Sequence, residues 1–262
     1  MNTLFPKYKL LLFTLLSILV LNACSDPAEV ENVATGKFKI EFDNYVGTKN
    51  LVLNSVTYQN AQNEDFTVSK FDYYISNIKL TRADGSSYTV PQDSSYFLIR
   101  EDIKASQIAL LNNVPIGDYK TIEFMVGVDS LRNTAPIEKL KGVLDQTGGM
   151  DGMYWQWNSG YIHMKLEGTS PVGNPVNNKF YYHIGLYGGY NERTVNNTRI
   201  VKLPLGDLTA SVTGQKSPEV HLIVDLLKVF NGPGTNLSIK QQEQSQKVAN
   251  NYAHMFTVDH IH

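Results

Sequence analysis

The sequence predicts an all-β fold, a β-sandwich with long loops and one short C-terminal helix. Short segments in which apolar and polar residues alternate recur along the chain, as in half-buried strands. Turn-forming residues separate these segments, and Gly accounts for 19 of the 262 residues. Tyr (15) and Phe (11) are abundant, and both favour strands. Short strands followed by one late helical segment are typical of a β-sandwich.

The N-terminal segment predicts a lipoprotein signal peptide over residues 1–23. Two lysines precede an apolar run over residues 10–21, which is too short to span a membrane as a mature helix. The run ends in Leu21-Asn22-Ala23-Cys24, which is similar to a bacterial lipobox, and Cys24 is the only cysteine. We expect acylation of Cys24 and an extracytoplasmic protein anchored to a bacterial membrane, on its periplasmic or cell-surface side. The alternative is a buried free thiol behind an uncleaved anchor.

The segment 24–36 is acidic and rich in small residues, and it predicts a lipidated tether. The folded domain is predicted over residues 37–262, beginning with a strand in which Phe38, Ile40 and Phe42 alternate with charged residues. The length allows one large domain or two small ones. We expect extra hairpins or long loops in one domain.

The remaining elements are predicted from the same alternation and from turn signals. A turn at residues 83–86 predicts a hairpin, and residues 103–111 predict a single helical turn. Polar loops are expected over residues 129–152 and 168–179. The predicted strands cover residues 52–58, 66–80, 88–90, 96–99, 119–128, 180–186, 200–205, 208–212 and 220–227, and the predicted helix covers residues 241–255.

The connection over residues 129–152 is long, irregular and acidic, and loops of this kind are usually functional or disordered. Asp129 and Asp145, with backbone carbonyls near Gly148 and Gly149, offer hard oxygen ligands of the kind that calcium prefers. They form a candidate calcium site, and the alternative is a set of solvated loop acids.

The segment over residues 150–168 holds both tryptophans, Trp155 and Trp157, together with His163. If the segment forms one strand, both indoles, Tyr161 and His163 lie on one face, because successive side chains point to opposite sides. This face is either an aromatic core stripe or a binding face on which imidazole ligates a metal and electron-rich indole is oxidised.

Several function classes are excluded or disfavoured. The net charge of −2 and the lack of a basic cluster argue against nucleic acid as a partner. The chain has no Gly-x-Ser-x-Gly motif, no phosphate-binding Gly-rich loop and no second cysteine, so we do not expect an enzyme.

Histidines are the remaining candidates for functional side chains. Imidazoles without thiolates suit copper, zinc or nickel, with copper favoured by the order of affinities. For a single strand histidine, the alternative is a hydrogen-bonded core residue. His260 and His262 would share a face if the C-terminal residues formed a strand, and the alternative there is a frayed terminus. The six histidines are His163, His183, His221, His254, His260 and His262.

An ordered set of motifs resembles the MbnP family, methanobactin-associated periplasmic copper proteins that are related to copper-repressible surface proteins of methanotrophs. The first motif is Met153-Tyr154-Trp155-Gln156-Trp157-Asn158-Ser159-Gly160-Tyr161, followed by Lys165-Leu166-Glu167-Gly168. The other motifs are Phe71-Asp72-Tyr73-Tyr74-Ile75-Ser76-Asn77-Ile78, Gly127-Val128-Asp129-Ser130, Tyr182-His183-Ile184-Gly185 and Asn251-Tyr252-Ala253-His254-Met255-Phe256.

The resemblance implies a copper protein in which a partner dihaem enzyme of the MauG type converts a tryptophan to kynurenine, which binds copper beside histidines. By position, Trp155 or Trp157 would be the modified residue, and His183 would be a copper ligand. His163 falls where the family has no fixed histidine, so it would either add a ligand or be incidental. The function implied is copper acquisition or handling. The alternative from the residues alone is a metal-free surface adhesin or glycan-binding module that uses exposed aromatic side chains for stacking.

Overall fold

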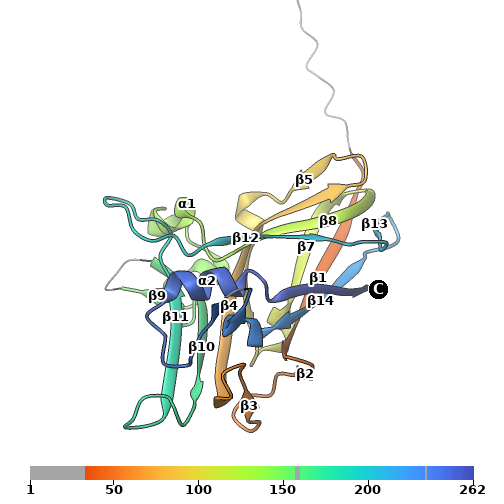
Figure 1. Ribbon diagram of the computed structural model, residues 1–262. Helices are drawn as coiled ribbons and strands as arrows, with labels where there is room; N and C mark the ends of the chain where they lie inside the picture. Colours follow the sequence, from red (N-terminus) through yellow and green to blue (C-terminus); the bar gives the residue numbers. More distant parts are fainter. Residues whose placement is uncertain (1–32, 157–159, 234) are drawn as a thin grey trace, which may run out of the picture. The chain divides into compact units, whose positions relative to one another are not determined.

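The computed structural model describes residues 33–156, 160–233 and 235–262 (Figure 1). The signal peptide, Cys24, most of the tether and Trp157 lie outside the described residues, so lipidation of Cys24 stays a prediction. Residues Ala34–His262 form one compact unit. Its first strand begins at Thr35, slightly before the predicted domain start at Lys37.

Two large sheets form the predicted β-sandwich, and the all-β prediction is confirmed (Figure 1). The first sheet has the order β17-β14-β1-β2, and β7 also pairs with β1. Its central pair, β1 and β14, is parallel, with Lys39 opposite Glu219 and Tyr45 opposite Asp225. The strands are β1 (Thr35–Val46), β2 (Lys49–Asn50), β7 (Ile108–Pro115), β14 (Glu219–Asp225) and β17 (Phe256–Ile261).

The second sheet has the order β11-β10-β4-β8-β12, and its pairs are antiparallel. Shorter strands extend it along β4, β8 and β10. Its main strands are β4 (Asp65–Arg82), β8 (Gly117–Val126), β10 (Gly160–Thr169), β11 (Lys179–Gly185) and β12 (Arg199–Pro204), and the shorter ones are β3 (Tyr58–Gln59), β5 (Ser87–Thr89), β6 (Tyr96–Arg100), β9 (Tyr154–Trp155) and β13 (Ala210–Val212). A separate hairpin joins β15 (Asn231–Gly232) and β16 (Thr235–Asn236).

The late helix is α2 (Ser245–Tyr252), shorter than the predicted span of residues 241–255, and it buries Val248 and Tyr252. A four-residue helix, α1 (Ser130–Asn133), was not predicted. The predicted strand over residues 52–58 is wrong, because residues 53–55 form a turn and only Tyr58 of this segment lies in a strand. None of the described helices is long and apolar enough to cross a membrane. The 3₁₀ turns are Gln92–Ser94, Lys104–Gln107, Ile137–Lys139, Gly142–Leu144 and Leu226–Val229.

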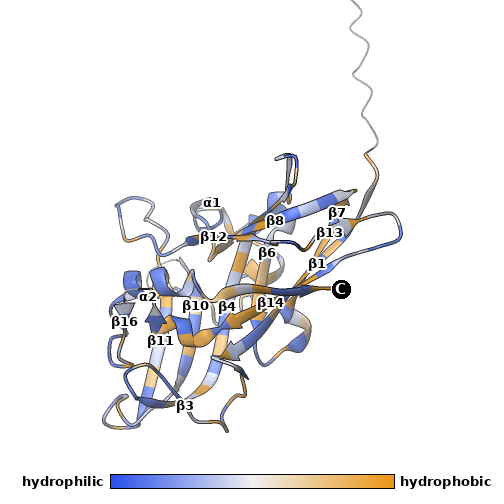
Figure 2. Ribbon diagram, turned by 45° about the vertical axis from the view of Figure 1, so that its right-hand side comes forward, coloured by the Kyte–Doolittle hydropathy of each residue, from blue (hydrophilic) through white to orange (hydrophobic). Residues whose placement is uncertain are grey.

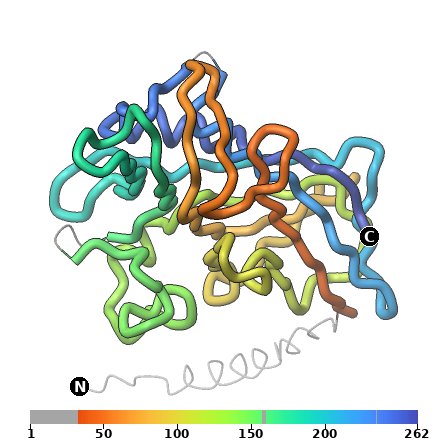
Figure 3. The backbone as a smooth tube through the Cα atoms, turned by 90° about the horizontal axis from the view of Figure 1, so that it is seen from below, coloured from red at the N-terminus to blue at the C-terminus, as the bar shows by residue number. Residues whose placement is uncertain are grey.

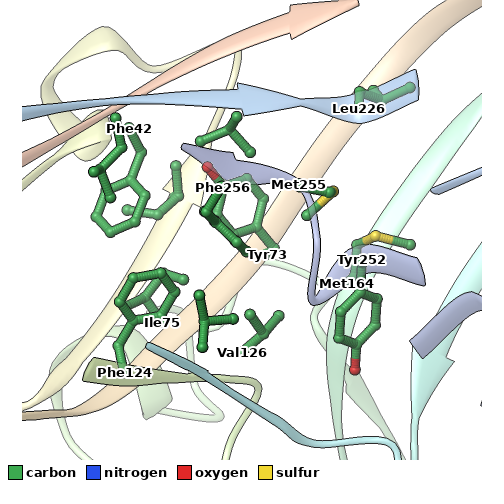
Figure 4. Close-up of a cluster of buried hydrophobic side chains, with 14 of the residues drawn as sticks. Phe42, Tyr73, Ile75, Phe124, Val126, Met164, Leu226, Tyr252, Met255 and Phe256 are labelled. Carbon is green, nitrogen blue, oxygen red and sulfur yellow. The ribbon is translucent and has the colours of Figure 1, made fainter. Parts of the chain in front are cut away.

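The main core lies between the two sheets and is rich in aromatic rings (Figure 4). Phe42 of β1 contacts Phe124 of β8 edge-on, with ring centroids 5.8 Å apart, and Phe124 contacts Phe256 of β17 at 5.0 Å. Each such pair contributes about 0.5–1.5 kcal/mol beyond the burial of its area. Figure 2 shows β14, which faces this core, as one of the more hydrophobic strands.

A second, smaller core lies on the opposite face of the second sheet. Tyr73 points into the main core and Tyr74 into the smaller one, as alternation along β4 requires. The connection over residues 129–153 covers this face, and it is bound to the sheet by two tyrosine hydroxyls. Tyr74 donates to the carbonyl of Val143 at 2.8 Å, and Tyr161 donates to the carbonyl of Leu144 at 2.5 Å. The long connection is therefore packed against the sheet.

Candidate functional site

The tryptophan segment is a hairpin and does not form the single strand that the alternation predicted. Trp155 of β9 pairs with Gly160 of β10, and Tyr154 pairs with Tyr161. The chain therefore reverses direction between Trp155 and Gly160, and Trp155 and His163 lie on different strands. Asn158-Ser159-Gly160 is a turn-forming sequence that the aromatic pattern obscured.

The indole of Trp155 lies against Gly185, the last residue of β11. A Cβ atom added at Gly185 would come 2.6 Å from Cζ3 of Trp155 and 2.8 Å from the carbonyl oxygen of Tyr161. No side chain fits in that space, so glycine at this position allows the indole to approach the backbone of β11. The tryptophan motif and the Tyr182-His183-Ile184-Gly185 motif thus meet at this contact.

His183 lies on the same face of β11 as the indole contact, because residues two apart in a strand share a face. Its Nε2 is 2.7 Å from Oε1 of Glu167, on the neighbouring strand β10. Burial lowers the pKa of His183 below its usual value, against the opposing effect of the Glu167 hydrogen bond. The imidazole is therefore neutral at neutral pH.

A neutral His183 has one nitrogen that donates and one that carries a lone pair. Since a carboxylate only accepts, Nε2 carries the proton and donates to Glu167. Among the residues that the structure describes, none hydrogen-bonds to Nδ1 of His183. Glu167 was missed from the sequence, although it belongs to the Lys165-Leu166-Glu167-Gly168 motif, because its role depends on the pairing of β10 with β11.

His163 has a different environment, fully buried at a β-bulge in β10. Its Nδ1 accepts from the backbone N–H of Val128 at 3.2 Å, and its Nε2 lies 3.1 Å from the carbonyl oxygen of Leu186, to which it donates. Burial lowers its pKa to about 4. Both ring nitrogens are thus used to hold three backbone segments together, and a ligand role for His163 has no geometric support. Gly127 allows this approach, since a Cβ there would come 2.8 Å from Cγ of His163.

The two acids of the candidate calcium site both bind donors of the protein. Oδ1 of Asp129 caps α1 by accepting from the N–H of Arg132 at 3.1 Å, and Oδ2 accepts from Asn77 at 2.9 Å and from the hydroxyl of Tyr96 at 2.5 Å. Oδ1 of Asp145 accepts from the N–H and the hydroxyl of Thr147, both at 2.8 Å. The structure thus gives each acid a local structural role. That calcium raises the Tm of chelator-treated protein stays a prediction.

The protein-family model of MbnP matches residues 35–254. Among solved structures, "MbnP from Methylosinus trichosporium" is similar at 17% sequence identity and a TM-score of 0.49, over 76% of this chain and 78% of that chain. No curated protein matches this chain.

Proposed function

Since the chain belongs to the MbnP family, we propose that it is a copper-binding protein that acts in copper acquisition or handling. Family membership indicates an extracytoplasmic protein with a methanobactin-related function. MbnP is not a known enzyme family, so the role proposed is binding.

The observation that carries this proposal is the geometry of His183. A ligating histidine commonly donates its second ring N–H to a carboxylate, which fixes the tautomer and the ring orientation. Glu167 is such a carboxylate, at 2.7 Å from Nε2, and the lowered pKa of His183 keeps its imidazole neutral, as a ligand must be. Trp155 belongs to β9, and its indole contacts the face of β11 that carries His183. These residues fit a copper ion held beside a modified tryptophan.

The second ligand in this proposal comes from Trp155 or Trp157. Conversion of tryptophan to kynurenine by a partner dihaem enzyme removes one carbon and adds one oxygen, which leaves an aryl amine and a ketone. The aryl amine and an imidazole together suit a metal of borderline softness. Trp155 is half-buried and touches the glycine two residues after His183, which supports Trp155 as the modified residue. His163 would act only by holding Leu186 and the end of β11 in place.

Intact-peptide mass spectrometry of protein from its native host tests the modification. The peptide that contains both tryptophans is expected to show the loss of one carbon and the gain of one oxygen. Trp155→Phe should abolish the change if Trp155 is the target, and Trp157→Phe should then leave it intact. Protein made without the haem partner is the control and should carry two unmodified indoles. Unmodified indoles in native protein would contradict the kynurenine proposal.

The proposed attachment to the membrane depends on Cys24 alone. Cys24→Ser is expected to move the protein from the membrane fraction to the soluble fraction, or to block its processing, because a hydroxyl replaces the thiol that is acylated. Fractionation followed by detection with an antibody measures this. Wild-type amounts of the variant in the membrane fraction, with the signal peptide removed, would show that the anchor lies elsewhere.

A further inference from the structure

Three histidines and an aspartate gather at the outer face of the first sheet, away from the proposed copper site. The pairing of β14 with β17 contains a bulge, since His221 is opposite His260 but Leu222 is opposite Val258. Asp259 is the extra residue. Val258 and Ile261 both pack against the main core, so Asp259 and His260 between them both face outward, on the same side as His221.

The bulge brings several ligand-type atoms close together. One ligand atom each from His221, Asp259 and His260 lies within 4.8 Å of the other two. Oδ2 of Asp259 is 3.1 Å from Nδ1 of His221 and 2.8 Å from Nδ1 of His260. Nε2 of His260 is 2.7 Å from Nε2 of His262. The bulge therefore brings two imidazoles to one carboxylate, with the imidazole of His262 against His260, in a group partly open to solvent.

Two carboxylates from β1 add to this group. Nε2 of His221 is 3.3 Å from Oδ2 of Asp43 and 4.0 Å from Oε2 of Glu41. His221 thus lies between carboxylates on both of its nitrogens, while a neutral imidazole has only one N–H to donate. A ring-nitrogen lone pair and the carboxylate opposite it are both groups that bind a divalent cation.

We propose that His221, Asp259 and His260 form a binding site for a divalent cation of borderline softness, such as Zn²⁺ or Cu²⁺. Imidazole nitrogens and a carboxylate without thiolates are the ligands that these ions take. Zinc bonds of about 2.0–2.2 Å require ligand atoms up to about 4 Å apart, so small rotations of the half-exposed Asp259 and His260 side chains would close the group around an ion. Asp259, His260 and His262 lie beyond the residues matched by the MbnP model, and the site does not depend on a modified tryptophan.

Zinc titration of the chelator-treated protein tests the site. The titration uses the His183→Ala background, so that the proposed copper site contributes nothing, and protein made without a haem partner. We expect saturable zinc binding at pH 7.5, weakened at least about tenfold by His260→Ala and by Asp259→Asn. Zinc at about a hundredfold excess over Kd is also expected to raise Tm by about 5 °C, because the ion joins β17 to β14.

His254→Ala provides the matched control, since His254 is an exposed histidine outside the group. It should leave both the zinc affinity and the Tm shift unchanged. The side chains of Asp259 and His260 are 47% and 44% exposed, so these variants are expected to fold. No saturable zinc binding, or equal zinc affinity in the Asp259→Asn, His260→Ala and His254→Ala variants, would overturn the site. The proposed copper function would be unaffected by that outcome.

Discussion

Replacing His183 with Ala is expected to weaken copper binding by at least about 100-fold while lowering Tm by no more than about 2 °C. The loss in affinity follows because Nδ1 of His183, to which none of the described residues bonds, carries a lone pair on the face of β11 that contacts Trp155. The effect on stability is small because the side chain is 31% exposed and its hydrogen bond to Glu167 lies near the surface. Competition with a copper chelator, on protein from the native host, measures the affinity.

The Glu167→Gln variant distinguishes the proposed ligand, His183, from Glu167, the residue that orients it. The amide oxygen of Gln can still accept from Nε2 but carries no charge, so copper affinity should fall by about tenfold, less than for His183→Ala. His254→Ala should bind copper as the wild type does. Wild-type affinity in His183→Ala, accompanied by a large loss of stability, would show that His183 is a core residue only.

The second large effect is a loss of folding stability at acidic pH, which we expect His163 to cause. Its pKa is about 4 in the folded protein and about 6.5 in an unfolded chain, so between these values the unfolded chain binds more protons. The stability that a neutral His163 contributes is therefore complete above about pH 6.5 and is lost as the pH falls toward 4. A difference of about 2.5 pKa units corresponds to about 3 kcal/mol of unfolding free energy.

His163→Leu is the variant that isolates this contribution. At pH 7.5 it should be less stable than the wild type by about 2–5 kcal/mol, because the N–H of Val128 and the carbonyl of Leu186 lose buried partners. Between pH 7.5 and 4 its free energy of unfolding should fall by about 3 kcal/mol less than that of the wild type. Urea unfolding at several pH values measures both. Parallel pH curves would mean that the pKa of His163 is not lowered in the folded protein.

The alternation of apolar and polar residues was sufficient to predict a strand where the strand is regular and one of its faces is buried. Phe38, Ile40 and Phe42 predicted β1, and all three are fully buried. It failed at β17, because the bulge at Asp259 breaks the period of two between Val258 and Ile261. The helical turn predicted over residues 103–111 is present as a 3₁₀ turn at Lys104–Gln107, but residues 108–111 belong to β7.

The candidate site was predictable only in part, for a reason of the same kind. The sequence identified the aromatic and histidine motifs, but it did not show that Trp155 would contact Gly185 or that Glu167 would bond to His183. Both contacts depend on which strands become neighbours in the second sheet. Periodicity within one segment carries no information on that choice.

The parallel pairing of β1 with β14 also has a consequence for the order of folding. Lys39 and Glu219, which bond across this pair, are 180 positions apart in the chain, so the centre of the first sheet closes one of the longest loops in the molecule. Until β14 has been synthesised, one edge of β1 has no partner strand in its final sheet. The backbone N–H and C=O groups on that edge stay unpaired, and the Phe and Ile side chains of β1 stay partly exposed. Figure 3 shows these two segments, from opposite ends of the colour scale, running close to each other. The nascent chain is thus most prone to aggregation before its last third emerges, which makes a holding chaperone during synthesis and export most valuable at that stage.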